Sequence, residues 1–447
     1  MKSSFSFFIC SLCYLLVLSC QPSVKKVKTP NIILIMADDM GYECLGCYGN
    51  AEYFTPNLDK MAEAGIRFNH CYAQPLCTPS RVKIMTGKHN FRNYTHFGYL
   101  NPEEKTFGNL FKEKGYKTLI VGKWQLNGLN RNNPGNQDKN RPHESGFEEY
   151  CLWQLTKRRN EGERYANPLI EQNGMVLDKL ENRYGPDIFR DYLIDFMERN
   201  RDSPFFIYYP MVLVHEPFVP TPDSETWTDP AMRYTKDTSY YKDMMEYADK
   251  IVGQIMERTR KLGLLENTLI LFTGDNGTDR SILSRMEDGR NIQGGKGMTY
   301  ETGNHVPLIV NWKDHILPGS VMDHLIDFND ILPTLAEIAQ IELNHYQTDG
   351  RSFASLLRGG RYTPNDYLYQ YYHPRWGTFD SAEYVWNHDY KLYGDGKFFH
   401  ISSDPYEMNK LDLNSLTREE NRLKLKFSEI LSERKKEYIK NLSSGEN

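Results

Sequence analysis

The sequence predicts an α/β fold: a large, doubly wound and mostly parallel β-sheet flanked by helices, followed by a smaller C-terminal α+β subdomain with an antiparallel sheet. Two observations support this prediction. Nearly continuous apolar runs alternate with amphipathic segments over most of the chain, and short aromatic runs follow them. Continuous apolar runs fit strands buried on both faces of a parallel sheet, and regular alternation with helices is typical of doubly wound domains. The chain of 447 residues is long enough for one large domain and a smaller one.

The apolar and amphipathic runs give the expected elements of the large sheet. The expected strands are 31–37, 117–121, 204–211, 268–273 and 306–312. The expected helices are 56–64, 106–114, 187–199, 240–262 and 328–339. Ligands of such folds gather at the carboxyl ends of the parallel strands, so we expect the functional side chains there.

The last quarter of the chain has a different pattern. Four short aromatic runs predict a small antiparallel sheet, and a charged amphipathic segment at 418–439 predicts a helix. Turn-forming residues at 349–352 and 358–360 mark the expected boundary. We therefore expect a catalytic domain over 30–350 and a C-terminal subdomain over 351–447. The four aromatic runs are 367–372, 384–386, 390–393 and 397–401.

The first residues are typical of a secretion signal. Lys2 precedes an apolar run over 5–18, which is too short for a stable membrane span. Residues 17–20 resemble a bacterial lipoprotein cleavage box, with Cys20 as the lipidated residue, although a plain signal peptide over 1–20 is the alternative. A polar tether over 21–29 would follow. We expect a periplasmic protein held to the membrane by a lipid anchor only, with the cell surface as the alternative.

Composition limits the partners and the redox chemistry. The net charge of -5 argues against a general polyanion binder, so no nucleic acid partner is expected. Besides Cys77 and the three cysteines of the leader, four remain, which allow up to two disulfides in an exported chain. Free thiols and disulfides both stay open for these four, which are Cys44, Cys47, Cys71 and Cys151.

Cys77 opens a short run that is typical of a helix start. Pro79 favours the first turn of a helix, and the apolar residues that follow continue with helical spacing. The sequence therefore predicts Cys77 at a helix N-terminus, where free N–H groups and the helix dipole attract anions. A buried structural cysteine is the alternative.

Acidic residues follow two of the expected strands. Asp38 and Asp39 come directly after 31–37, and Asp275 and Asn276 come after 268–273. Carboxylate and amide oxygens suit Ca²⁺ or Mg²⁺ rather than zinc. Two converging carboxylates also need a cation, because like charges repel. An ordinary helix cap and an ordinary turn are the alternatives.

The run Cys77-Thr78-Pro79-Ser80-Arg81 resembles the signature of the type I sulfatases of the alkaline phosphatase superfamily. Five further segments occur in the order found in that family, over nearly the whole chain after the leader. The resemblance implies that a maturation enzyme oxidises Cys77 to Cα-formylglycine (3-oxoalanine), whose hydrate attacks the sulfur of a sulfate ester. The segments are 38–39, 122–124, 215–217, 275–277 and 294–297.

The same resemblance implies the roles of the other site residues. Ca²⁺, or Mg²⁺ instead, would be held by the modified residue 77 together with Asp38, Asp39, Asp275 and Asn276. Arg81 would hold the hydrated aldehyde or the metal carboxylates. The expected sulfate-binding and leaving-group residues are Lys123, His215 and Lys296.

Gln125 departs from the family pattern, which has a histidine there that is thought to accept a proton during turnover. An amide can hydrogen-bond but cannot act as a base. Four histidines are candidates for the missing base, although a continuous helix would carry His89 about 18 Å from Cys77. His305 is expected to be structural or to face the substrate. The four candidates are His70, His89, His96 and His305.

Substrate contacts are less clear from the sequence. Gln125 is expected to contact the substrate. Arg375 and Trp376 belong to an aromatic and basic cluster that suits sulfated sugars, with subdomain core as the alternative. The basic run 157–159 is expected to be a solvated surface, with substrate contact second.

These observations together predict an exported, formylglycine-dependent sulfatase, with a sulfated carbohydrate as substrate because of the exported bacterial setting. Two alternatives stay open: a formylglycine-dependent phosphonate or phosphate monoesterase, and a noncatalytic sulfated-glycan-binding lipoprotein.

Overall fold

The computed structural model describes residues 29–444 of the chain. The expected signal peptide, the lipidated Cys20 and all but the last residue of the expected tether lie outside these residues. The lipid anchor and the periplasmic location therefore stay predictions. Within the described residues, no helix combines the length and the apolar character that crossing a bilayer requires.

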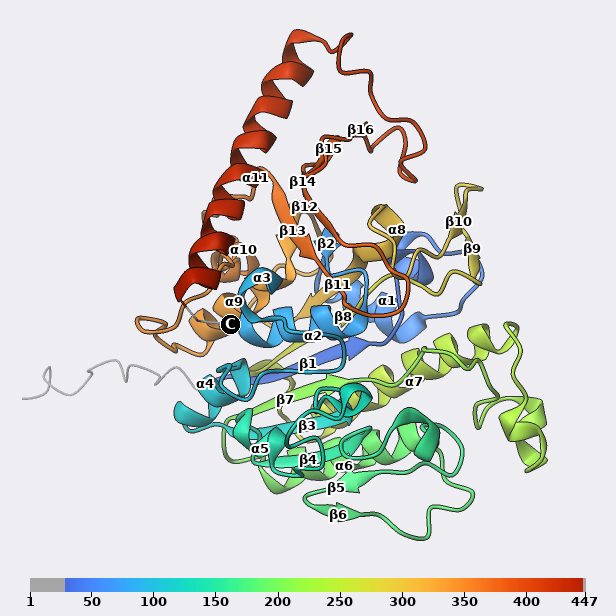
Figure 1. Ribbon diagram of the computed structural model, residues 1–447. Helices are drawn as coiled ribbons and strands as arrows, with labels where there is room; N and C mark the ends of the chain where they lie inside the picture. Colours follow the sequence, from blue (N-terminus) through green and yellow to red (C-terminus); the bar gives the residue numbers. More distant parts are fainter. Residues whose placement is uncertain (1–28, 445–447) are drawn as a thin grey trace, which may run out of the picture.

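A ten-stranded mixed sheet forms the centre of the large domain (Figure 1). Its strands are β1 (Asn31–Ala37), β2 (Ile66–Tyr72), β3 (Lys117–Lys123), β4 (Glu149–Trp153), β5 (Glu171–Gln172), β6 (Met175–Val176), β7 (Phe205–Pro210), β8 (Thr268–Gly274), β11 (His305–Asn311) and β12 (Ser320–Asp327). They lie in the order β12-β2-β11-β8-β1-β7-β3-β4-β5-β6. The central strands β8, β1, β7, β3 and β4 are all parallel, as expected. β11 is an exception, antiparallel to both β8 and β2.

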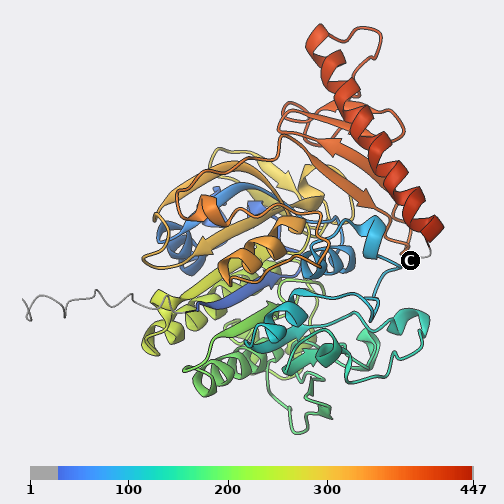
Figure 2. The same ribbon diagram turned by 90° about the vertical axis from the view of Figure 1, so that its left-hand side faces the viewer.

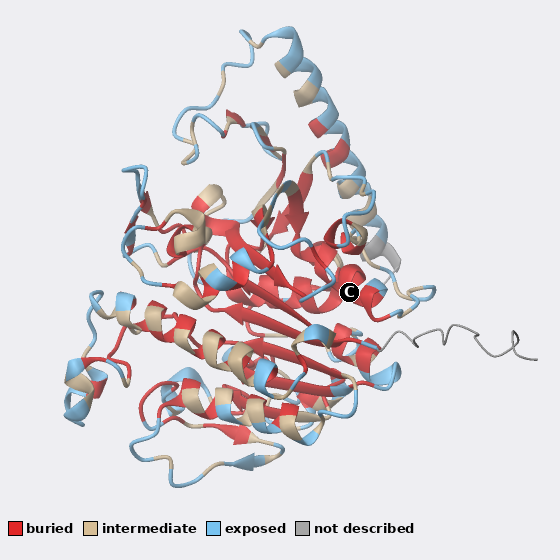
Figure 3. Cartoon of the chain, turned by 180° about the vertical axis from the view of Figure 1, so that it is seen from behind, coloured by how far each residue is buried: buried red, intermediate tan, exposed pale blue. Residues whose placement is uncertain are grey.

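Helices cover both faces of this sheet, and β1 shows how. Ile32 and Leu34 pack into the core beneath α2 (Cys77–Thr86), α4 (Phe107–Glu113) and α9 (Ile331–Ile338). Ile33 and Ile35 pack on the opposite face, with α1 (Pro56–Glu63), α6 (Gly185–Arg199) and α7 (Tyr240–Lys261). A strand buried on both faces needs an apolar residue at every position. Figure 3 shows the buried strands between the partly exposed helices.

The C-terminal subdomain is a separate antiparallel sheet with one long helix, as predicted. Its strands are β13 (Leu368–Tyr372), β14 (Ala382–Trp386), β15 (Tyr390–Tyr393) and β16 (Phe398–His400), paired in that order. The helix α11 (Arg418–Ser444) lies along this sheet in both ribbon views (Figures 1 and 2). Phe427 and Ile430 of α11 pack on Tyr369 and Val385. The expected boundary at 350/351 stays a prediction.

Short elements complete the described fold. They are α3 (Asn90–Asn93), α5 (Arg141–Glu144), α8 (Glu301–Asn304), α10 (Ala354–Leu357), and the hairpin of β9 (Leu283–Arg285) and β10 (Asn291–Gln293). The cysteines of the described region are all free, so the structure favours free thiols over disulfides for the four left open.

Every residue of α2 is buried, including two cations, which is unusual for a helix of a soluble domain. One of them, Lys83, places Nζ 2.6 Å from Oδ1 of Asp327 and 3.1 Å from Oε1 of Gln370. Gln370 lies in β13, and its Nε2 donates to the carbonyl of Ala73 at 2.7 Å. The buried lysine therefore fixes α2 against both the large sheet and the C-terminal sheet.

We expect Lys83→Met to destabilise the protein by about 3–5 kcal/mol, because it leaves the carboxylate of Asp327 buried without its cation. Chemical denaturation would show this as a lower midpoint. The control is Lys105→Met, whose partner Glu113 is exposed, and whose loss should cost at most about 1 kcal/mol. Equal midpoints for the two variants would contradict the role given to Lys83.

Candidate active site

Cys77 is the first residue of α2, as the sequence predicted. Leu76 precedes it in an extended conformation, with φ of -134°, and the four residues 73–76 connect the end of β2 to the helix. Cys77 is 2% exposed and lines a cavity of about 1050 Å³. Burial raises the pKa of the Cys77 thiol, so the unmodified side chain is not a thiolate at neutral pH.

Three carboxylates meet at the carboxyl edge of the sheet. β1 and β8 are parallel neighbours, so the residues that follow them lie side by side. The N–H of Asp39 donates to Oδ1 of Asp275 at 3.1 Å, and Nδ2 of Asn276 donates to Oδ1 of Asp39 at 2.9 Å. The main chain of Asp38 pairs with residues 213 and 214, which carries His215 to the same edge. All three carboxylates are fully buried.

Three cationic side chains compensate these carboxylates. Nζ of Lys123, at the end of β3, lies 2.9 and 2.8 Å from the two carboxylate oxygens of Asp38. Nη2 of Arg81 lies 3.0 Å from Oδ2 of Asp275, so Arg81 contacts a carboxylate of the expected metal site. Nζ of Lys296 lies 2.5 Å from Oδ2 of Asp39.

The charges set the protonation of the site. Burial is the largest influence and raises the pKa of Asp39, and it raises that of Asp275 to about 7 with help from the charge of Asp38. Burial acts on Asp38 too, but Lys123 and Arg81 outweigh it and lower the pKa of that carboxyl. Burial, rather than a lack of nearby cations, therefore opposes the ionisation of Asp39 and Asp275, and a bound metal ion would favour it.

His215 is held as a neutral imidazole. Burial, followed by the charges of Lys296 and Lys123, lowers its pKa well below the usual value. Nδ1 lies 2.8 Å from the carbonyl oxygen of Glu216, which can only accept, so Nδ1 carries the proton. Nε2 then accepts from Nζ of Lys296 at 3.1 Å.

The residues fit a hard divalent cation. Oδ1 of Asn276 is buried and has no hydrogen-bond partner among the described residues. Carboxylate oxygens of Asp38 and Asp275 and Sγ of Cys77 all lie within 4.8 Å of one another, as do ligand atoms of Asp38, Asp39 and His215. An oxygen-rich set with an unpaired amide oxygen suits Ca²⁺ or Mg²⁺. The residues that would hold the ion are the expected ones: Asp38, Asp39, residue 77, Asp275 and Asn276.

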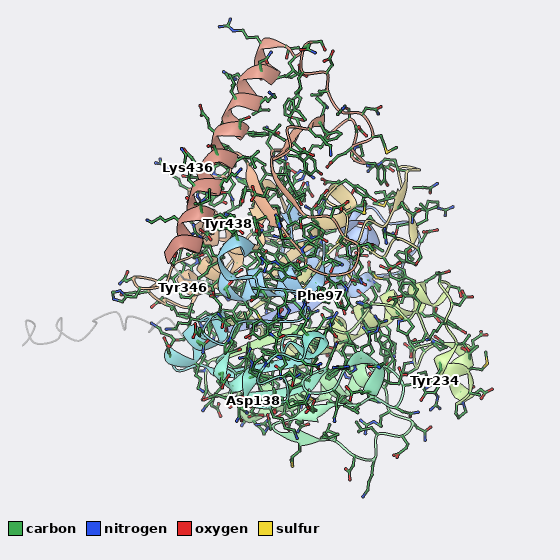
Figure 4. All side chains as sticks on the ribbon, viewed as in Figure 1. Phe97, Asp138, Tyr234, Tyr346, Lys436 and Tyr438 are labelled. Carbon is green, nitrogen blue, oxygen red and sulfur yellow. The ribbon has the colours of Figure 1, made fainter. Side chains whose placement is uncertain are left out.

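Four expected substrate contacts line the cavity, namely Gln125, His215, Lys296 and Trp376, whereas Lys123 does not. Oε1 of Gln125 accepts from Sγ of Cys77 at 3.2 Å. The ring of Trp376 stacks on Phe97 at 4.7 Å between centroids. Figure 4 labels Phe97 together with Tyr234, another lining residue, which comes from the segment before α7.

Two expected substrate contacts are corrected. The ring of His305 is buried and stacks on Tyr42 at 4.0 Å, and its Nδ1 lies 2.6 Å from a carboxylate oxygen of Glu301. His305 is therefore structural and does not face the substrate. Arg375 donates to the carbonyl of Thr95 at 2.5 Å and does not line the cavity. Its side chain secures a loop instead.

None of the four candidate histidines is placed to act as the base that position 125 lacks. None of the four lines the cavity that contains Cys77. His89 is buried with Nδ1 2.8 Å from Nδ2 of Asn329, in a different cavity beneath β13. The four histidines are His70, His89, His96 and His305.

Several further basic residues line the cavity. Arg158 and Arg159 are exposed, as expected of a solvated charge run, and they also line the cavity. Three others were not considered, because they lie in loops without a recognisable pattern. They are Arg164, Lys236 and Arg280.

Comparison with known proteins agrees with this geometry. The family model described as Sulfatase matches residues 30–341, and one described as N-sulphoglucosamine sulphohydrolase, C-terminal, matches residues 294–436. Arylsulfatase A of Homo sapiens is 32% identical over 388 residues, which cover 80% of this chain and 73% of that protein. Steryl-sulfatase of Rattus norvegicus is 28% identical, covering 76% and 73%. N-acetylgalactosamine-6-sulfatase of Homo sapiens is 29% identical, covering 75% and 67%.

Solved structures share the fold. One, solved in complex with its substrate D-glucosamine-2-N,6-O-disulfate, superposes with a TM-score of 0.72 at 23% identity and covers 93% of this chain and 99% of that one. The phosphonate monoester hydrolase of Agrobacterium radiobacter gives 0.67 at 17% identity, covering 92% and 96%.

The sheet and the charged site at its carboxyl edge define an alkaline phosphatase-like hydrolase. Within that superfamily the chain belongs to the type I sulfatases, and it is a sulfuric ester hydrolase.

We expect removal of divalent cations with a chelator to lower the melting temperature, and their return to raise it. A bound ion stabilises by about 2.7 kcal/mol at 100 times its dissociation constant. Asp275→Asn should abolish most of this increase, because it removes a ligand charge. The control Asp366→Asn changes an exposed carboxylate and should keep the full increase. An equal melting temperature with and without divalent cations would contradict the metal site.

Proposed function

We propose that the protein hydrolyses a sulfate ester of a carbohydrate and that residue 77 acts as Cα-formylglycine, formed from Cys77 by a maturation enzyme. The observation that supports this most directly is the place of Cys77. It begins a buried helix, and its Sγ lies within 4.8 Å of oxygens of Asp38 and Asp275. A nucleophile formed there would have an adjacent cation to stabilise its charge.

The hydrated aldehyde would supply the oxygen that attacks sulfur, and the divalent cation would stabilise that oxygen and polarise the sulfate. The chain's own residues do the rest. His215 and Lys296 line the place where the sulfate would lie, and the ammonium of Lys296 would bind a sulfate oxygen while Lys123 adds positive charge from behind Asp38. Arg81 holds Asp275, and its Nη1 also donates to the carbonyl of Lys123 at 3.0 Å, which fixes that lysine.

The leaving alcohol needs a proton, and Lys296 is the protonated group of the site. Burial opposes its charge, but Asp39 outweighs burial and raises the pKa of the ammonium. His215 carries its only ring proton on Nδ1, which donates to a carbonyl, so it cannot give a proton from Nε2. Lys296 would therefore supply the proton, directly or through Nε2 of His215.

Two features support a carbohydrate. The cavity of about 1050 Å³ is much larger than one sulfate group requires, and both basic side chains and aromatic rings line it. N-acetylgalactosamine-6-sulfatase is among the relatives, although so are arylsulfatase A and steryl-sulfatase. We also propose Ca²⁺ as the ion, because a flexible set of four or five oxygen ligands fits it better than Mg²⁺.

The two alternatives rest on single observations. The fold shared with a phosphonate monoester hydrolase keeps a phosphonate or phosphate monoesterase open. Gln125 in place of a histidine keeps open a protein that binds sulfated glycans without turnover.

We expect the peptide that contains residue 77 to have the mass of the aldehyde after expression with a maturation enzyme. The same sample should release sulfate from at least one member of a panel of sulfated sugars, because the site then has its nucleophile. Cys77→Ala is the control and should bind the divalent cation but release nothing.

Other outcomes separate the alternatives. Release of phosphate at a higher kcat/KM than sulfate would favour the monoesterase. If Cys77 stays unmodified in a host that converts a control sulfatase, the formylglycine mechanism is contradicted, and a noncatalytic protein that binds sulfated glycans is favoured.

We expect Gln125→His to raise kcat at least tenfold on the best sulfated sugar, since a positioned base contributes about 10²–10⁴ in rate. Gln125 already contacts residue 77, so the imidazole would lie within reach of it. Gln154→His is the matched control: it lines the same cavity and should not raise kcat. An unchanged or lower kcat for Gln125→His would show that this chain turns over by a route that does not need a base at position 125.

A further inference from the structure

Arg164 is a buried guanidinium without a hydrogen-bond partner. It is 3% exposed, and within the described part of the chain no acceptor bonds to its Nη1. Its Cζ lies 4.2 Å from the centroid of the Trp153 ring and 5.7 Å from that of the Tyr165 ring. A guanidinium has five N–H donors, and leaving them unpaired in the interior is costly. Such a group is expected to have a partner that the protein itself does not supply.

The other buried arginines of the described chain, unlike Arg164, have hydrogen-bond acceptors. Arg81 donates to the carbonyl of Lys123 and to Asp275. Arg141 donates to the carbonyl of Leu100, and Arg233 donates to a carbonyl and to a side-chain amide. Each of these three has acceptors within the chain, so burial alone does not explain the unpaired state of Arg164.

The backbone holds Arg164 firmly in this position. A Cβ on Gly185 would lie 2.0 Å from the carbonyl oxygen of Arg164, so the first turn of α6 packs directly on it. The next residue, Tyr165, accepts from the N–H of Gly185 at 2.8 Å, and its hydroxyl donates to the carbonyl of Val212 at 2.9 Å. The guanidinium is thus prearranged, and a ligand would not have to order it.

Arg164 also lies at the reaction centre. It lines the cavity together with Cys77, and its Nη1 is 4.0 Å from Oδ2 of Asp38, beyond hydrogen-bonding distance. With Arg164 counted, four cationic side chains face three carboxylates before any metal ion is added. These are Arg81, Lys123, Arg164 and Lys296 against Asp38, Asp39 and Asp275. A bound divalent cation would increase the positive excess, which only an anion from outside can offset.

We propose that Arg164 binds an oxyanion group of the substrate with its planar N–H fork. The group is either an oxygen of the sulfate that is released or an acidic substituent next to it on the sugar. Both are oxyanions, which the fork binds through paired hydrogen bonds. The inference rests on the proposed function, since it assigns a contact of the same cavity.

The test measures binding to the full-length protein with Cys77 unmodified, so that it does not depend on turnover. Calorimetry would compare two probes, a monosaccharide monosulfate and the same sugar with a second sulfate. We expect Arg164→Met to weaken the disulfate at least tenfold, as loss of a hydrogen bond between charged groups does. Arg164→Lys keeps the charge but not the fork and should recover part of the affinity.

The melting temperature separates this role from a structural one. Arg164 has no hydrogen-bond acceptor within the described chain, so Arg164→Met should lower the melting temperature less than the loss of a hydrogen-bonded buried arginine does. The matched control is Arg141→Met, another buried arginine, which lies outside the cavity and has its acceptor. It should lower the melting temperature and leave probe binding unchanged.

The monosulfate locates the contact. Equal weakening of both probes by Arg164→Met would place the fork on the sulfate that is released, and weakening of the disulfate alone would place it on the neighbouring group. Unchanged affinity for both probes in Arg164→Met, or no binding of either probe by the wild-type protein, would overturn the inference. If binding depends on Arg164 but no sulfate is ever released, the proposed hydrolysis fails and this inference stands.

Discussion

The arrangement of the site depends on the repulsion among three buried carboxylates. Asp38, Asp39 and Asp275 cannot all ionise in the interior without cations close by. The chain supplies Lys123 from the end of β3, Arg81 from α2 and Lys296 from the loop after β10. Ion pairs therefore hold together, at the carboxyl edge of the sheet, segments that are far apart in the sequence. A cation bound at Asn276 would complete the same compensation.

The topology brings these groups together, and the sequence reveals most of that topology. The run 31–37 is β1 residue for residue, because a strand covered on both faces is nearly continuously apolar, with Asn31 at its first position as the polar exception. Asp38 and Asp275 could be predicted as neighbours because they follow adjacent parallel strands. β2 was missed because polar residues such as Arg67 and Asn69 interrupt its apolar pattern, although it sits within the sheet.

The parts of the site that sequence reasoning missed come from loops. Arg164 lies in the insertion between β4 and β5, where neither strand alternation nor helical spacing indicates which way a side chain faces. For His305 the sequence left two roles open, structural or substrate-facing, and the structure favours the structural one, because the residue begins β11 and is buried against aromatic rings. Local pattern predicts elements and their ends well, whereas the direction of a loop side chain depends on packing between distant segments.

Two unpaired polar atoms show what the site still needs. Oδ1 of Asn276 is an acceptor without a donor, and Nη1 of Arg164 is a donor without an acceptor. Asn276 bonds to Asp39, and Arg164 lies beside Asp38, so the two atoms flank one pair of aspartates. Oδ1 of Asn276 could be paired by a cation, and Nη1 of Arg164 could be paired by an anion. A sulfate group bound next to a divalent cation would satisfy both atoms at once, because its oxygens can contact the metal and the guanidinium together. Two buried polar atoms without partners raise the free energy of the folded, empty site. Ligand binding would remove this unfavourable free energy, so part of the affinity would come from pairing these two atoms.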